Sequence, residues 1–178
     1  MTAVSLKRSM APVGSADARL LILGSLPGEA SLAAQRYYAH PTNQFWRLLG
    51  AAIGEDLAGI AYEERLERLA ARAIALWDVV AEARRHGSLD GAIRAATANE
   101  LAAYVATHAR LEAVAFNGRT AAAIGRRALD ARAGLILIDL PSSSAALTRP
   151  IADKARAWAA LGRHAGVARR RERFTLGG

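Results

Sequence analysis

Short, almost continuously apolar runs recur along the chain, and each ends in small or polar residues. Four of them have the length of buried strands: 19–24, 74–80, 111–116 and 134–140. Segments between them place apolar residues at helical spacing, as in 55–73. Strands that are apolar on both faces and alternate with helices are typical of a parallel sheet covered on both sides. The pattern therefore predicts a three-layer α/β/α fold with a four-stranded parallel sheet.

The same pattern predicts the remaining helices and the extent of the fold. Helices are expected from Phe45 onward and over 81–86, 89–109, 120–131 and 151–161. No internal repeat, low-complexity block or linker divides the chain. We therefore expect a single domain over 1–178, with 1–17 and 165–178 as flexible ends.

Composition excludes several classes of protein. Hydrophobic residues make up 52% of the chain and charged residues 22%, as in ordinary globular domains. Cysteine is absent, which excludes disulfide scaffolds, thiolate metal sites and a cysteine nucleophile. No apolar run approaches the roughly 18 residues of a membrane helix, and the first residues lack the apolar core of a signal peptide. We expect a cytoplasmic protein without membrane association.

The net charge points to an anionic partner. The chain carries a formal charge of +8, and +6 of it falls within residues 149–178. Such a balance favours nucleic acid or a phosphorylated ligand. The basic tail is either a solvated surface or a set of phosphate contacts that carry no sequence information.

The ends of the predicted strands carry the polar chemistry. The first strand ends in the loop 24–28, GSLPG, whose small residues let a ligand approach the backbone. This loop lacks the lysine of a phosphate-binding loop and the third glycine of a dinucleotide fingerprint. The other strands end at Asp78, Asn117 and the loop 141–144, PSSS. Ligands of parallel sheets bind at this edge, so we expect the site there.

The segment 37–46, YYAHPTNQFW, concentrates four of the ten aromatic residues beside an amide and an imidazole. Aromatic rings are stacking platforms for nucleic-acid bases. The alternative is a packing loop in which Asn43 caps the helix that begins at Gln44. His40 is a candidate for indirect support of the site.

Five motifs in this order resemble the uracil-DNA glycosylase superfamily. They are GSLPGEASL, YYAHPTNQFW, ALWDVV, AFNG and LPSSSAAL, and the likeness runs from about Arg19 to about Leu161. The hypoxanthine-DNA glycosylase-like group is the most similar branch. The resemblance implies a four-stranded parallel sheet between helices. It also implies hydrolysis of the N-glycosidic bond of uracil or hypoxanthine in DNA, without metal or other cofactor.

The resemblance also implies candidate catalytic residues. Relatives carry asparagine or aspartate at the position of Leu26, whose side chain cannot hydrogen-bond a water molecule. In the relatives that side chain positions the attacking water. In the hypoxanthine-type group this role resembles one held by the asparagine of the HPTNQFW motif, here Asn43. We expect Asn43 to orient water or to steady the sugar cation. Glu29 is a competing candidate, because a carboxylate is a stronger base than an amide.

The same comparison implies which residues hold the base. Backbone groups of Gly24, Ser25 and Leu26 are expected to contact it. Gly28 stands where uracil-specific relatives place a tyrosine that excludes larger bases, so a purine is sterically possible here.

Three side chains complete the expected base pocket. Tyr38 corresponds to an aromatic ring that stacks on the flipped base. Asp78 corresponds to an asparagine that reads the base edge; an ionised carboxylate only accepts hydrogen bonds and suits a base N–H. Alternatively, Asp78 caps a helix. Asn117 either contacts the base or forms the turn before Gly118.

The loop 141–147 resembles the family's DNA-contacting motif. Ser142, Ser143 and Ser144 are expected to contact phosphates, together with Arg149. Residues 145–147 could form a wedge between bases. Leu140 replaces a histidine of the classical uracil enzymes, which argues against their chemistry.

These observations predict a monomeric, monofunctional DNA glycosylase that acts on a deaminated base and leaves an abasic site. The motifs contain no lysine for a Schiff base. Two alternatives belong to other classes: a non-catalytic binder of damaged or abasic DNA, and an α/β enzyme for a nucleotide or sugar phosphate. The leucine at position 26 is the main argument for the non-catalytic binder.

Overall fold

The computed structural model describes residues 5–129 and 134–166. In chain order its elements are β1 (Ser5–Arg8), β2 (Val13–Gly14), β3 (Leu20–Gly24), α1 (Glu29–Ala34), α2 (Phe45–Ile53), α3 (Tyr62–Ala71), β4 (Ile74–Asp78), β5 (Val80–Arg85), η1 (Asp90–Ala92), β6 (Arg94–Ala98), α4 (Leu101–Ala106), β7 (Ala113–Asn117), α5 (Arg119–Leu129), β8 (Ile136–Leu140), α6 (Ile151–Trp158) and η2 (Ala159–Arg163).

The larger of the two sheets in the described residues contains the four predicted strands. Its order is β2-β4-β3-β7-β8. β3 lies in parallel between β4 and β7, and β8 pairs in parallel with β7. The two-residue strand β2 adds an antiparallel edge next to β4. The predicted α/β fold and its parallel strands are confirmed, with β2 as an addition.

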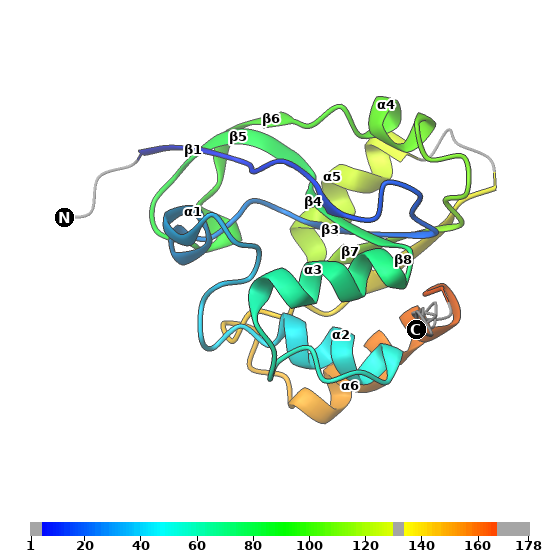
Figure 1. The fold of residues 1–178 in the computed structure, drawn as a ribbon. Coiled ribbons are helices and arrows are strands. Elements are labelled where there is room, and N and C mark those ends of the chain that lie inside the picture. The colour runs from blue at the N-terminus through cyan, green and yellow to red at the C-terminus, as the bar shows by residue number, and fades with distance from the viewer. Residues whose placement is uncertain (1–4, 130–133, 167–178) are drawn as a thin grey trace, which may run out of the picture.

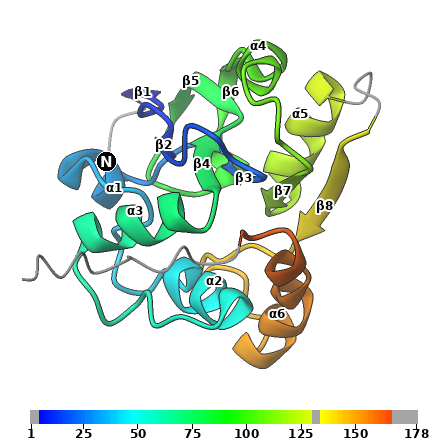
Figure 2. The same ribbon diagram turned by 45° about the vertical axis from the view of Figure 1, so that its right-hand side comes forward.

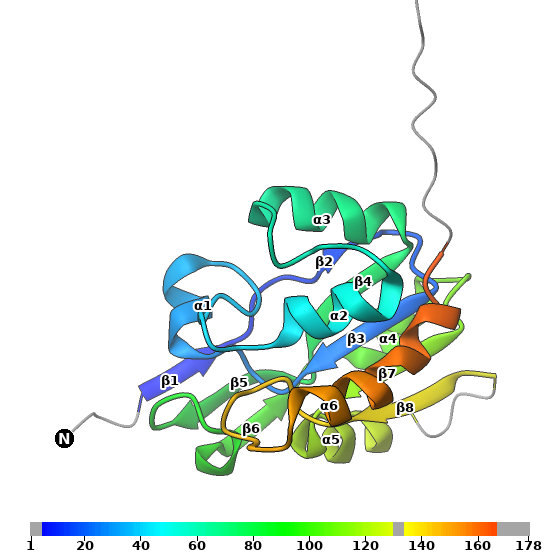
Figure 3. The ribbon, with the colours of Figure 1, turned by 90° about the horizontal axis from the view of Figure 1, so that it is seen from below.

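Helices cover both faces of this sheet, as Figures 1 and 2 show. Along β3, Leu20 and Ile22 face α2, α3 and α6, whereas Leu21 and Leu23 face α4 and α5. All four side chains are fully buried. In the view from below, α2, α3 and α6 lie together in front of the sheet (Figure 3). Burial on both faces explains the continuous apolar runs of β3, β4 and β7, whereas the edge strand β8 is only partly buried.

The helices predicted over 81–86 and 89–109 are wrong for most of their length. The chain forms the strands β5 and β6 there, which join β1 in an antiparallel sheet of order β1-β5-β6, and only the short 3-10 helix η1 and the α-helix α4 are helical. Alanine, glutamate and arginine in β5 favour helices locally, but pairing with strands on both sides overrides this weak preference. Because β5 follows β4 directly, no helix begins after Asp78, and its alternative role as a helix cap is also wrong.

Part of the N-terminal segment is ordered rather than flexible. Residues 5–8 pair with β5, and residues 13–14 pair with β4, which corrects the expectation for 1–17 over these positions. At the other end, Gly166 donates a hydrogen bond to the carbonyl of Arg72. Residues 167–178, which form the rest of the expected flexible end and the last part of the basic tail, lie outside the described residues.

Candidate active site at the ends of the parallel strands

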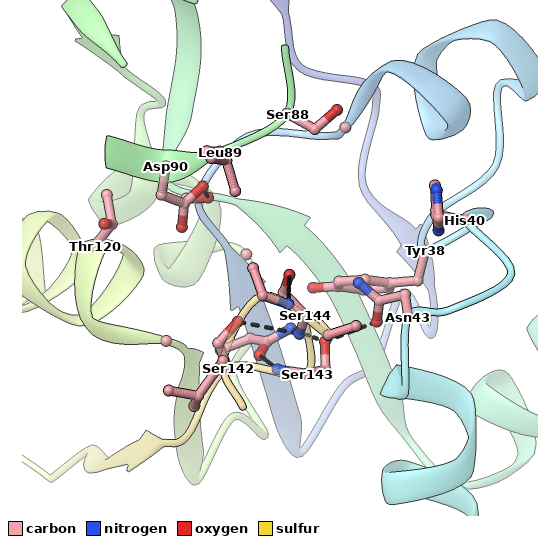
Figure 4. Close-up of a pocket in the computed structure, with 18 of the residues that line it drawn as sticks. Tyr38, His40, Asn43, Ser88, Leu89, Asp90, Thr120, Ser142, Ser143 and Ser144 are labelled. Atoms are coloured by element: carbon pink, nitrogen blue, oxygen red, sulfur yellow. Dashed lines mark hydrogen bonds between the residues drawn. The ribbon is translucent and has the colours of Figure 1, made fainter. Parts of the chain in front are cut away.

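A cavity of about 670 Å³ lies where β3, β4, β7 and β8 end (Figure 4). This volume is typical of a small-molecule site. Twelve of the thirteen residues expected at the site line it: Gly24, Ser25, Leu26, Gly28, Tyr38, Asn43, Asp78, Asn117, Ser142, Ser143, Ser144 and Arg149. The exception is Glu29. The edge predicted from the strand ends is therefore where the cavity lies.

Gly24 lets two polar groups meet over the end of β3. A Cβ atom at this position would lie 2.7 Å from Asp78 Oδ1 and 2.9 Å from the Tyr38 hydroxyl oxygen. Both distances are shorter than van der Waals contact permits, so only glycine leaves these groups in place. The deep end of the cavity thus combines a carboxyl oxygen with a phenol hydroxyl.

Tyr38 is held in an unusual conformation. Its φ angle of 54° lies in the left-handed region, which is uncommon for a residue other than glycine. One face of its ring stacks on Phe45, with the ring centroids 3.7 Å apart and the planes 5° from parallel. Its hydroxyl is buried and has no hydrogen-bond partner among the described residues. Burial raises the pKa of this hydroxyl, so it stays protonated and can donate to a ligand.

Asp78 presents an acceptor to the cavity in either protonation state. The residue is 3% exposed, and this burial raises the pKa of its carboxyl to about 7. The Ser9 hydroxyl oxygen lies 3.0 Å from Oδ2 and 3.1 Å from the carbonyl oxygen of Met10. A proton on Oδ2 can therefore be donated to Ser9, which in turn donates to Met10. Oδ1, on the side of Gly24, remains an acceptor throughout.

The Asn43 amide is fixed by a buried network. Its Oδ1 accepts hydrogen bonds from the Phe45 N–H at 3.0 Å and from the Ser143 hydroxyl at 2.9 Å. The Ser143 hydroxyl accepts from Asn117 Nδ2, and the Ser143 N–H donates to Asn117 Oδ1. A backbone N–H can only donate, so the Asn43 atom beside Phe45 must be the oxygen. The group left for a ligand is the Asn43 NH₂, a donor.

This network changes three expectations. Asn43 Oδ1 accepts from the N–H of the first residue of α2, as the capping alternative requires, and Asn43 also lines the cavity. Asn117 uses both ends of its amide on Ser143. Ser143 is 1% exposed, with its hydroxyl and N–H both engaged, so it holds the two amides and is not a phosphate contact. Ser142, Ser144 and Arg149 remain at the cavity rim.

Glu29 lies outside the cavity lining. Its side chain is 52% exposed, and one carboxylate oxygen pairs with Lys7 Nζ at 3.1 Å. The residue begins α1, beyond the loop that lines the cavity. This position does not bring its carboxylate to the base pocket.

The connection between β5 and β6 supplies cavity residues that sequence reasoning missed. Ser88, Leu89 and Asp90 all line the cavity, on the side opposite Tyr38 and Asn43 in Figure 4. The Ser25 hydroxyl donates to Asp90 Oδ1 at 2.5 Å. Burial raises the pKa of the Asp90 carboxyl, although the Ser25 hydrogen bond and the Arg85 charge oppose this. The turn signal GSLDG at 87–91 could have revealed this loop.

The same connection shapes the loop after β3. Arg85 is fully buried and donates to the carbonyl oxygens of Leu26, Pro27 and Gly87. A Cβ at Gly28 would lie 3.3 Å from the Ser88 hydroxyl oxygen. The space that the glycine was expected to leave open is thus bordered by Ser88.

Two negative findings concern the described residues. Residues 5–129 and 134–166 contain no cluster of three or more histidine or acidic side chains that could hold a metal ion. Within the same ranges, no helix is long and apolar enough to cross a membrane.

Comparison with known proteins identifies the family. The model of the uracil DNA glycosylase superfamily matches residues 11–162. A hypoxanthine DNA glycosylase of Methanosarcina acetivorans is 38% identical over 89% of this chain and 99% of its own length. One from Methanosarcina barkeri is 43% identical over 64% of this chain and 72% of its own length.

A solved structure agrees. The solution NMR structure of a Methanosarcina acetivorans protein, described as a candidate uracil DNA glycosylase, superposes with a TM-score of 0.79 and 38% identity. The match covers 90% of this chain and 98% of that one. The chain therefore belongs to the uracil DNA glycosylase superfamily.

Proposed function

We propose that the protein is a DNA glycosylase that hydrolyses the N-glycosidic bond of a deaminated base, hypoxanthine or uracil, and leaves an abasic site. The observation that carries this proposal is the convergence of Tyr38, Asp78 and Asn43 on one cavity at the strand ends. Family membership and the names of the two Methanosarcina relatives support it.

The deep end of the cavity suits the edge of a deaminated base. Hypoxanthine carries an N1–H beside a carbonyl, and uracil has the same pair at N3–H and its neighbour. Asp78 Oδ1 accepts the N–H, and the unpartnered Tyr38 hydroxyl donates to the carbonyl. Adenine has an acceptor at N1 and an amino group beside it, so it would leave these groups unpaired. Such a mismatch is a strong source of discrimination.

Asn43 assists departure of the base. Its NH₂ group donates into the cavity, whereas its oxygen is engaged by Phe45 and Ser143. A donor cannot steady a sugar cation, so we replace that expectation. A fixed donor does stabilise negative charge that develops on the leaving base, or holds the oxygen of a water molecule.

The rim is suited to DNA. Base flipping costs a few kcal/mol, less at a mispair, and must be offset by contacts in the cavity and on the backbone. Ser142, Ser144 and Arg149 supply phosphate contacts, and the 38%-exposed Leu147 supplies an apolar wedge. No lysine lines the described cavity, in keeping with a monofunctional reaction without a Schiff base. We expect a monomer acting on cytoplasmic DNA.

A panel of oligonucleotides tests the proposal. Duplexes and single strands carrying hypoxanthine, uracil, xanthine or adenine at one position are incubated with the protein, and abasic sites are revealed by alkali. We expect cleavage with hypoxanthine or uracil, none with adenine, and no covalent adduct after borohydride treatment. Binding of damaged DNA without any abasic product would instead identify a non-catalytic binder.

A further inference from the structure

Asp90 is a carboxylate at the cavity that the family motifs do not include. It begins η1 in the connection between β5 and β6, in a part of the chain where the sequence predicted a helix. Its Oδ1 accepts the hydrogen bond from Ser25, at the end of β3. Oδ2 makes no hydrogen bond to any described residue. In Figure 4 the carboxyl group faces the cavity from the side opposite Tyr38 and Asn43.

Asp90 is better placed than Asp78 to meet a water molecule. These two are the only carboxylates that line the cavity in the described residues. Asp78 is 3% exposed, lies at the deep end and has Oδ2 next to Ser9. Asp90 is only partly buried and lies between Leu89, which is 62% exposed, and the loop after β3. A sugar attached to a base at the deep end would lie toward the open side of the cavity, where Asp90 and Leu89 are.

The imidazole at the rim is less suited to accept a proton. The Thr42 N–H donates to His40 Nδ1 at 3.2 Å, so in the neutral ring the proton must be on Nε2. Both nitrogens are then occupied, one by a hydrogen bond and the other by a proton. The Asn43 amide offers a donor, and Leu26 offers no polar side chain. Asp90 therefore remains as the acceptor for a proton from water.

We propose that Asp90 is the general base of the glycosylase reaction, an inference that rests on the proposed function. Water attacks C1′ as the C1′–N bond breaks, and the electron pair of that bond leaves with the base. One water proton passes to Asp90 Oδ2, and the oxygen forms the C1′ hydroxyl of the abasic sugar. The departing base takes a proton from solvent, and Asp90 later returns its proton to solvent.

The surroundings of Asp90 suit this task. A base is most effective when its pKa approaches the working pH, and burial raises the pKa of Asp90 in that direction. The Arg85 charge, from β5, lowers the pKa of Asp90, and Asp90 in turn raises the pKa of Asp78 on β4 and of Tyr38. Arg85 and Ser25 keep the carboxylate ionised enough to accept a proton.

The test compares Asp90→Asn with a matched control, Glu82→Gln. Both substitutions remove one carboxylate charge from the same hairpin, but Glu82 pairs with Arg8 outside the cavity. Single-turnover base release is measured across pH 5–9 on the oligonucleotide that the wild-type protein cleaves best, and binding to abasic-site DNA is measured in parallel. We expect Asp90→Asn to lower the rate at least about 100-fold and to flatten the acidic limb of its pH profile. Binding should stay within about threefold, and Glu82→Gln should match wild type in both assays.

Other outcomes separate the inference from the function it rests on. Wild-type release together with an Asp90→Asn rate within about threefold of wild type would overturn the role of Asp90 and leave the glycosylase function intact. A loss of rate matched by an equal loss of DNA binding would also overturn it, because Asp90 would then only hold the hairpin in place. Failure of the wild-type protein to release any base would overturn the proposed function itself.

Discussion

The two sides of the cavity are built in different ways. The serine wall consists of the loop 141–147 with Asn43 and Asn117, and the hairpin wall consists of the connection 86–93. In the serine wall, hydrogen bonds link Asn43, Ser143 and Asn117 into one buried network. In the hairpin wall the side-chain hydrogen bonds are separate ones: Ser25 donates to Asp90, the Glu29 N–H donates to Ser88, and Arg85 donates to the carbonyl of Gly87.

This difference separates two chemical tasks. A donor that must stabilise developing charge works best when it is fixed beforehand, and the serine wall fixes the Asn43 NH₂ group. A base must gain and lose a proton, and the partly open hairpin wall gives Asp90 access to water. We therefore infer that the serine wall stabilises the leaving base and that the hairpin wall accepts the proton from water.

A buried cation stabilises the serine wall from behind. Lys154 on α6 is fully buried, and its Nζ donates to Gln44 Oε1 at 3.0 Å and to the Ser144 carbonyl oxygen at 2.9 Å. In addition, the Gln44 N–H donates to the Ser143 carbonyl. The start of α2 and the serine loop are therefore held together on both sides of Asn43.

The largest effect is expected for Asn43→Asp, which tests the donor in the serine wall. Aspartate can still accept from Phe45 and Ser143, so the network survives, but the NH₂ donor is lost. Base release under single-turnover conditions should fall about 100-fold or more, as for loss of one fixed donor elsewhere. A rate close to wild type would show that the Asn43 donor is not used.

The second largest effect is expected for the buried cation that supports the serine wall. Lys154→Met keeps the length of the side chain but leaves the Gln44 and Ser144 oxygens without their donor. Urea denaturation should show a free energy of unfolding lower by about 1–3 kcal/mol. Arg156→Met, on the exposed side of the same helix, is the control and should change it by less than about 0.5 kcal/mol. Equal losses in the two variants would contradict the role given to Lys154.

The smallest effect is expected in the hairpin wall, for Ser25→Ala. Losing one hydrogen bond should lower the free energy of unfolding by about 1 kcal/mol. Because the Ser25 hydrogen bond lowers the pKa of Asp90, its removal should raise that pKa and move the acidic limb of the rate profile to higher pH. The pH dependence of single-turnover release measures this shift. A shift of the acidic limb to lower pH would show that the Ser25 hydrogen bond does not lower the pKa of Asp90.

The contrast between the walls also explains what the sequence could predict. The strands β3, β4 and β7 were recognisable because burial on both faces makes them almost entirely apolar. The edge strand β8 was recognisable from its apolar run although Ile136 is 51% exposed, and the ends of the four strands located the cavity. The hairpin was missed because the residues of β5 favour helices locally and only pairing with β1 and β6 makes them a strand.

Individual roles depend on contacts between residues far apart in the chain. Asn43 and Ser143 are 100 positions apart, and no local pattern shows that one fixes the amide of the other. Ser143 therefore looked like a phosphate contact beside Ser142 and Ser144. Glu29 was a candidate because a carboxylate is a stronger base than an amide, yet its side chain lies outside the cavity and pairs with Lys7.

The most direct test is the structure of the protein bound to duplex DNA that carries 2′-fluoro-2′-deoxyinosine, whose glycosidic bond resists cleavage. We predict that hypoxanthine leaves the base stack and places its N1–H within hydrogen-bond distance of Asp78 Oδ1, with its carbonyl oxygen at the Tyr38 hydroxyl. A base that stays in the helix, or that enters the protein away from Tyr38 and Asp78, would contradict the account.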